Sequence, residues 1–250
     1  MRAFVTSFIL GSALALGATS AKAADMTDDH VNELIEAYIK AHPHVIFNAV
    51  SDYLVKEEQK SAAKAVEDAF NNPVPFTLSD HTPVLGDKDA PVTIIQFAEF
   101  ECPFCATAHE TLTEVMRRYK SKVRLAFVHM PLSFHKHAIP AAKAAIAAQR
   151  QGKFWEYHDA LFANQDKLGE KLFIQTAKEL GLDMAKFDKD RNDPALDDLI
   201  QTDSKSGAAI GARGTPYFLI NGVAVNGAQP IEAFEAVIER HLANLDKKGK

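Results

Sequence analysis

The stretch "PVTIIQFAEFECPFCATAHETLTEVMRRYK", residues 91–120, holds both cysteines of the 250-residue chain, Cys102 and Cys105. Its first part is a near-continuous apolar run, which is typical of a β-strand buried on both faces. Pro103 then stands where a helix can begin, because the first helical position needs no backbone N–H. Beyond it, apolar side chains recur at helical spacing, at Leu112, Val115, Met116 and Tyr119. The stretch therefore predicts a strand, a turn that carries Cys-x-x-Cys, and a helix.

Two cysteines this close together make a poor structural cross-link. A bridge that closes a loop of about four residues contributes roughly 2 kcal/mol, against about 4.7 kcal/mol for a hundred-residue loop. At a helix N-terminus, the unpaired N–H groups and the partial positive charge favour Cys102 as the thiolate, which is the nucleophilic form. We expect Cys102 to be a reachable attacking thiol with a pKa below that of free cysteine. Cys105, more buried, would resolve the mixed disulfide.

Two acidic neighbours, Glu99 and Glu101, oppose this ionisation. Exposed charge pairs contribute about 1 kcal/mol or less, whereas a helix terminus contributes up to about 2 kcal/mol. The sequence therefore still predicts a lowered pKa for Cys102.

Charge and the first residues restrict where the protein acts and what it binds. The formal net charge is −5, which gives no electrostatic footprint for nucleic acid or anionic lipid. Residues 1–23, "MRAFVTSFILGSALALGATSAKA", combine Arg2, an uncharged apolar run and a small-residue end at Ala21 and Ala23. This pattern predicts a signal peptide cleaved after Ala23, with a retained membrane anchor as the alternative. The mature protein would then act outside the cytoplasm, where disulfides persist.

Residues 24–72 form a helical region of a different character. Apolar residues follow one helical face, at Val31, Leu34, Ile35, Tyr38 and Ile39, and again at Ile46, Val50, Tyr53 and Leu54. Thr27 can cap the first helix, and His42-Pro43 interrupts it. Such narrow stripes cannot form a core alone, so these helices must pack on the main domain or on copies of themselves.

The remaining chain divides into a linker and one large domain. Residues 73–84 are proline-rich and have no helical period, which predicts a linker. Residues 85–250 then continue as strand, helix, strand, a helical block at about 138–210, two short strands around the turn Asn221-Gly222, and a final helix. The order places Cys-x-x-Cys at a strand-to-helix junction.

Several further motifs carry a family resemblance. Besides the CPFC segment, these are "HMPLSFHKHAIPAAKAA" (129–145), "QGKFWEYHDALF" (151–162) and "GARGTPYFLING" (211–222). Together they resemble the DsbA-like thiol:disulfide oxidoreductases, and most of all the ScsC-type (suppressor of copper sensitivity) periplasmic proteins. The resemblance implies an α/β thioredoxin fold with a DsbA-type helical insertion, preceded by an N-terminal helical arm that mediates oligomerisation through residues 24–72.

The resemblance also implies an activity and partners. The expected function is a periplasmic protein disulfide isomerase or reductase, with a DsbA-like dithiol oxidase as the alternative. The expected partners are proteins with cysteines, a membrane redox partner of the DsbD/ScsB or DsbB type, and further copies of the chain. No cofactor is expected.

The site residues follow from the same resemblance. Pro103 and Phe104 lie between the cysteines, while the Thr215-Pro216 bond is expected to be cis, to face them and to bind substrate. One departure stands out: where many members carry a buried carboxylate, this chain has Gln96. Glu99 is then either the substitute proton relay or a solvated surface residue.

Metal binding is the alternative from another class of function. A copper- or zinc-binding redox chaperone would use the same two cysteines, and histidines occur nearby in the sequence, at His109, His129, His135 and His137. Two of these alternate along the chain and would point apart if extended, so we predict no dedicated metal site. Trp155 and its aromatic neighbours are interpreted as helix-packing core.

Overall fold

The computed structural model describes residues 27–248, which form two compact units divided between Ser61 and Ala62. The predicted signal peptide lies outside the described residues. In the first unit, α1 (Asp28–Ala41) begins after Thr27, whose hydroxyl accepts a hydrogen bond from the His30 amide (3.4 Å). The chain breaks at His42, and α2 (Pro43–Asn71) continues into the second unit. The predicted cap and break are both confirmed.

The first unit leaves its apolar face uncovered. None of the residues of α1 is buried. Large apolar side chains of both helices stay exposed, among them Leu34, Ile35, Tyr38, Ile46, Phe47, Val50, Tyr53 and Leu54.

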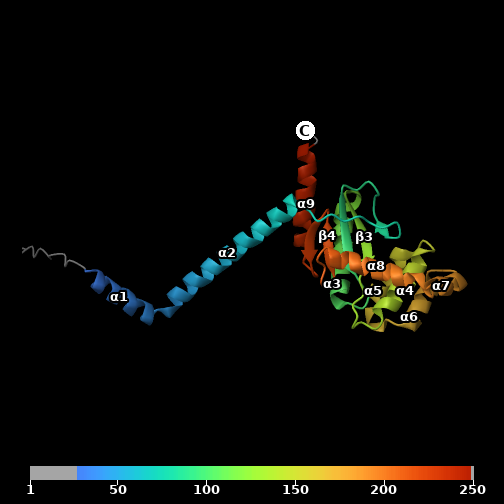
Figure 1. Ribbon diagram of the computed structural model, residues 1–250, viewed down its shortest axis with the longest axis horizontal. Coiled ribbons are helices and arrows are strands. Elements are labelled where there is room, and N and C mark those ends of the chain that lie inside the picture. Colours follow the sequence, from blue (N-terminus) through green and yellow to red (C-terminus); the bar gives the residue numbers. More distant parts are fainter. Residues whose placement is uncertain (1–26, 249–250) are drawn as a thin grey trace, which may run out of the picture. The chain divides into compact units, whose positions relative to one another are not determined.

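The second unit is built on a five-stranded sheet in the order β1-β3-β2-β4-β5. Strands β3 and β4 of this sheet are labelled in Figure 1. The central strand β2 (Val92–Ala98) runs parallel to β3 (Val123–His129), with Ile94 opposite Leu125. Strand β4 (Tyr217–Ile220) lies antiparallel to β2, and β5 (Val223–Asn226) and β1 (Val84–Leu85) form the two edges. The near-continuous burial of β2 agrees with the prediction of a strand covered on both faces.

Helices cover one face of this sheet. Helix α3 (Pro103–Tyr119) and helix α9 (Ile231–Lys248) share a core cluster with the strands. That cluster includes Ile94, Leu112, Val115, Phe218 and Phe234, all fully or almost fully buried.

The opposite face is covered in part by the segment predicted as a linker. It contains no helix or strand before β1, but Val74, Phe76 and Leu78 pack against the sheet cluster around Phe97. The Val74 amide also donates to the Gly222 carbonyl (2.8 Å). At Gly222 the backbone is left-handed (φ +88°), and a Cβ would lie 2.7 Å from Pro73. The hairpin turn therefore requires glycine both for its conformation and for this close approach.

The helical block between β3 and β4 has five α-helices: α4 (Ala138–Gln149), α5 (Phe154–Ala163), α6 (Glu170–Glu179), α7 (Met184–Arg191) and α8 (Ala195–Ala209). Their core contains Phe154, Tyr157, Leu161 and Phe162, with Trp155 packed against it, as predicted.

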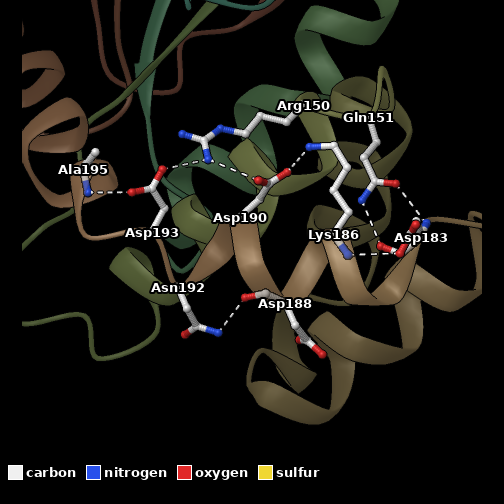
Figure 2. A network of polar contacts seen from close by, with 9 residues as sticks. All are labelled: Arg150, Gln151, Asp183, Lys186, Asp188, Asp190, Asn192, Asp193 and Ala195. Atoms are coloured by element: carbon white, nitrogen blue, oxygen red, sulfur yellow. Dashed lines mark hydrogen bonds and ion pairs between the residues drawn. The ribbon is translucent and has the colours of Figure 1, made fainter.

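Helix α7 lies within the helical block predicted at about 138–210, and polar contacts hold it in place (Figure 2). Asp183 caps it by accepting from the Lys186 amide (3.0 Å), and Gln151 pairs with both backbone groups of Asp183. Arg150, at the end of α4, donates to Asp193 (2.9 Å) and Asp190 (3.4 Å). These contacts attach α7 to α4.

Candidate active site

The two cysteines lie where β2 gives way to α3. Cys102 is the N-cap residue with extended backbone (φ −70°, ψ 118°), and Pro103 opens the helix. Both cysteines are free thiols; Cys105 is fully buried, and Cys102 exposes 2% of its surface. The sequence predicted a reachable Cys102 sulfur, whereas the structure leaves this residue almost completely buried.

The surroundings of Cys102 favour its thiolate. Its pKa is lowered to about 5, and the largest cause is the hydrogen bond from the Cys105 thiol. Burial opposes the shift, while Thr215 and the backbone N–H groups of Cys105 and Phe104 assist it. The predicted direction is confirmed. The neighbouring thiol, however, outweighs the helix N-terminus, which the sequence had suggested as the main cause.

Cys105 is held in the opposite state. Burial, followed by the hydrogen bond to the Cys102 sulfur, raises its pKa far above that of free cysteine. At neutral pH the pair therefore consists of an anionic sulfur that accepts a hydrogen bond and a neutral thiol that donates it.

A loop from the far end of the chain faces this pair. The Thr215-Pro216 peptide bond is cis, as the resemblance implies, and β4 begins directly after it. The Cys102 sulfur lies 3.3 Å from the Thr215 carbonyl oxygen. Pro216 is buried and Thr215 is half-buried.

Gln165 is a contact that sequence analysis missed. Its amide nitrogen donates to the carbonyls of Phe100 (2.7 Å) and Cys102 (2.9 Å), and so fixes the backbone at the start of α3. Gln165 belongs to the helical block, in the short 3₁₀-helix Gln165–Lys167. No sequence pattern marked it, because a single polar residue in a helix connection is ordinary.

Glu99 is buried, exposing 1% of its surface, so the alternative of a solvated surface residue is wrong. Its carboxylate accepts from the Glu101 amide (2.6 Å) and pairs with Nδ1 of His135. Burial raises the pKa of Glu99, and the nearby Cys102 charge adds to this effect. His135 is about one-fifth exposed, so the pair connects the buried site to solvent.

Gln96 is also buried. Neither of its side-chain polar atoms has a hydrogen-bond partner among the described residues. An amide at this position cannot accept a proton, which leaves Glu99 as the buried carboxylate close to the cysteines.

Two exposed aromatic side chains lie on segments adjoining the cysteines. Phe104 is 64% exposed, and Phe134 is 76% exposed on the loop that carries His135. Both rings are therefore available for apolar contacts beside the cysteines.

The histidines considered for metal binding separate in the structure. His135 pairs with Glu99, and His129 is fully buried with its pKa lowered to about 3. Among residues 27–248, one group of three possible metal-ligating side chains lies close together, and it consists of His109, His158 and Asp159. Neither cysteine belongs to it.

A Cys-x-x-Cys motif at a strand-to-helix junction, facing a cis-proline on this mixed sheet, defines a thioredoxin-fold protein with a redox-type site. The chain belongs to the thioredoxin family, whose sequence model, described as Thioredoxin, matches residues 78–240.

Solved structures show the same fold. A thioredoxin-like oxidoreductase from Silicibacter pomeroyi is 28% identical, with a TM-score of 0.60 over 65% of this chain and 92% of its own. α-DsbA1 from Wolbachia pipientis (22% identity, TM-score 0.62) matches 71% of this chain and 97% of its own. The catalytic domain of Proteus mirabilis ScsC (18% identity, TM-score 0.59) matches 72% and 98%. These likenesses confirm the thioredoxin fold with a DsbA-type helical insertion.

Curated relatives share part of the chain. The Na(+)/H(+) antiporter NhaA 3 of Salinispora tropica is 38% identical over 166 residues, and NhaA of Herminiimonas arsenicoxydans is 34% identical over 160 residues. The matches cover 66% and 64% of this chain but 25% of each antiporter. The chain thus spans about a quarter of the length of these relatives. None of the helices described between residues 27 and 248 combines the length and the hydrophobicity that a membrane-spanning segment requires.

Proposed function

We propose that this protein exchanges disulfides with cysteines of other proteins through Cys102 and Cys105. One observation carries the proposal: the two adjacent sulfurs have pKa values displaced in opposite directions. The thiolate is the attacking species in disulfide exchange, and a sulfur with a pKa near 5 is almost fully ionised at neutral pH.

The exchange proceeds in two substitutions at sulfur. The Cys102 thiolate attacks a substrate disulfide, forming a mixed disulfide as the substrate S–S bond breaks and one substrate thiolate leaves. Cys105 then attacks the Cys102 sulfur, which closes the Cys102–Cys105 disulfide and releases the second substrate thiolate. In this direction the substrate is reduced and the protein oxidised, and the reverse sequence oxidises a substrate dithiol.

The second substitution requires Cys105 to lose its proton. Glu99 supports a role as the relay, because its carboxylate is buried near the cysteines with a raised pKa. His135 offers the next acceptor and is partly exposed to solvent. Sequence analysis proposed Glu99 for this role and considered His135 as a metal ligand.

Substrates would lie across Thr215 and the exposed aromatic rings. The backbone before Pro216 faces Cys102 and can pair with an extended peptide, as in strand addition. Phe104 and Phe134 provide apolar contacts for a non-native chain, whose hydrophobic side chains are exposed.

Isomerisation, or reduction, is the direction we favour over dedicated oxidation. Isomerisation benefits from several active sites facing one misfolded client, and the exposed apolar face of α1 and α2 supports self-association. The signal-like residues 1–23 support a periplasmic location, where a membrane redox partner would keep Cys102 reduced. For the copper- or zinc-binding alternative, the described residues bring no third ligand to the cysteines.

The test compares refolding of a scrambled disulfide protein with oxidation of a reduced one. The full chain carrying Phe47→Glu and Leu54→Glu, two exposed apolar positions, should become a monomer that loses isomerase activity but still exchanges dithiols. Asn48→Glu, a charge added at an exposed polar position, is the control. Isomerase activity that persists in the monomer would refute the role of the arm. The proposal also requires Cys102→Ser to lose both activities, the refolding of the scrambled protein and the oxidation of the reduced one.

A further inference from the structure

A group of side chains unused by the proposed chemistry lies between α3 and α5. His109 belongs to α3, one turn beyond Cys105, while His158 and Asp159 belong to α5. One ligand atom from each of the three lies within 4.8 Å of the others. They line a pocket of about 130 Å³, together with Thr113 and Met116.

The distances in this group suit a tetrahedral metal ion. Oδ1 of Asp159 lies 2.8 Å from Nδ1 of His158 and 3.8 Å from Nε2 of His109. Zinc bonds of about 2.0–2.2 Å to nitrogen and oxygen place tetrahedral ligand atoms roughly 3.3–3.6 Å apart. The two separations from Asp159 bracket this value, and the imidazole ligand atoms lie within 4.8 Å of each other. Binding an ion would therefore require the imidazoles and the carboxylate to rotate toward a common centre.

The surroundings fix the two imidazoles and leave a route for an ion to enter. His109 stacks on Phe162 (centroids 5.1 Å apart, planes at 18°), and His158 lies edge-on to Trp155 (5.1 Å). His158 is 98% buried, yet its Nε2 has no hydrogen-bond partner among the described residues, which is unusual for a buried ring nitrogen. Asp159, in contrast, is 62% exposed.

From this arrangement we infer that His109, His158 and Asp159 form a binding site for a divalent first-row metal ion, with zinc as its representative. Two imidazoles and one carboxylate are a common protein ligand set for zinc, and the fourth position would face the pocket and hold water. The ion would join the helix that carries the cysteines to the helical block. The site is separate from the Cys102–Cys105 pair.

Zinc binding to the full chain tests this inference, with the cysteines oxidised so that no thiol competes. Equilibrium dialysis with metal analysis should give one zinc ion per wild-type chain. Asp159→Asn and His109→Gln should each lower the affinity by at least about tenfold. Both positions are partly exposed, and far-UV circular dichroism should match the wild type.

His44→Gln is the matched control, because His44 of α2 and His42, the C-cap of α1, form an exposed histidine pair. This variant should bind zinc as the wild type does. The inference is overturned if the oxidised wild type binds no zinc, if Asp159→Asn and His109→Gln bind it unchanged, or if His44→Gln removes the bound ion.

Discussion

The hydrogen bond from Cys105 to Cys102 can be removed without touching the nucleophile, which makes its contribution measurable. Cys105→Ala deletes the donor, whereas Cys105→Ser replaces the S–H with an O–H. The Cys105 thiol is the largest cause of the low pKa of Cys102, so the two variants should differ in that pKa.

The expected size follows from the energy of a hydrogen bond to a charged group, about 1.5–3 kcal/mol. At 1.36 kcal/mol per pKa unit, loss of the donor raises the pKa of Cys102 by about 1–2 units. The value should therefore move from about 5 in the reduced wild type to roughly 6–7 in Cys105→Ala. The backbone N–H groups remain and keep it below that of free cysteine.

Thiolate absorbance at 240 nm, followed against pH, measures this directly. The reduced wild type should show one transition near pH 5, because Cys105 stays protonated throughout the accessible range. Cys105→Ser should stay close to the wild type. Equal pKa values in Cys105→Ala and the wild type, or an equally large rise in Cys105→Ser, would refute the reasoning.

Three further results are expected. Glu99→Gln should slow closure of the Cys102–Cys105 disulfide from a glutathione mixed disulfide by up to about 10²-fold, measured by stopped flow; a wild-type rate at every pH would exclude Glu99 as relay. The reduced wild type should gain stability relative to Cys102→Ser, because the folded pKa of Cys102 is depressed. This gain, about 2 kcal/mol after allowance for solvent screening, should be complete above about pH 8.5 and vanish as pH falls through about 5. A pH-independent difference in urea unfolding would contradict it. Asp183→Ala should cost about 1 kcal/mol of stability through loss of the α7 cap, and an unchanged urea midpoint would show that this cap contributes nothing.

The parts of the fold set by local patterns could be predicted from the sequence. The apolar run of β2 and the helical spacing after Pro103 placed both cysteines correctly. Asn221 and Gly222 have positive φ values (46° and 88°), which fit the two-residue hairpin that this dipeptide predicts.

The segment at residues 73–78 has the alternating apolar pattern of an extended chain that packs on one side. Val74, Phe76 and Leu78 alternate with other residues, and this period of two places them on one side of an extended chain. Their packing against the sheet follows from that pattern, although the prolines around them suggested only a linker.

Other features depend on packing between distant segments, which no local pattern encodes. The burial of Glu99 and its pairing with His135 require the loop after β3 to fold over the start of α3. Helix α7 has one buried apolar residue, Phe187, so its helical period is too weak to mark its bounds within the predicted helical block. The effect of the Cys105 thiol on the pKa of Cys102 is larger than the sequence suggested. The strength of this S–H donor depends on the burial of both sulfurs, which the sequence does not give.

The central claim is that Cys102 is the ionised, attacking sulfur and Cys105 the protonated, resolving one. Alkylation of the reduced protein by iodoacetamide, with each site quantified by mass spectrometry from pH 4 to 9, tests this most directly. The account predicts rapid modification of Cys102 with a pH midpoint near 5, and no modification of Cys105 in the folded protein. A Cys102 that reacts no faster than free cysteine at pH 6, or a Cys105 that reacts first, would contradict it.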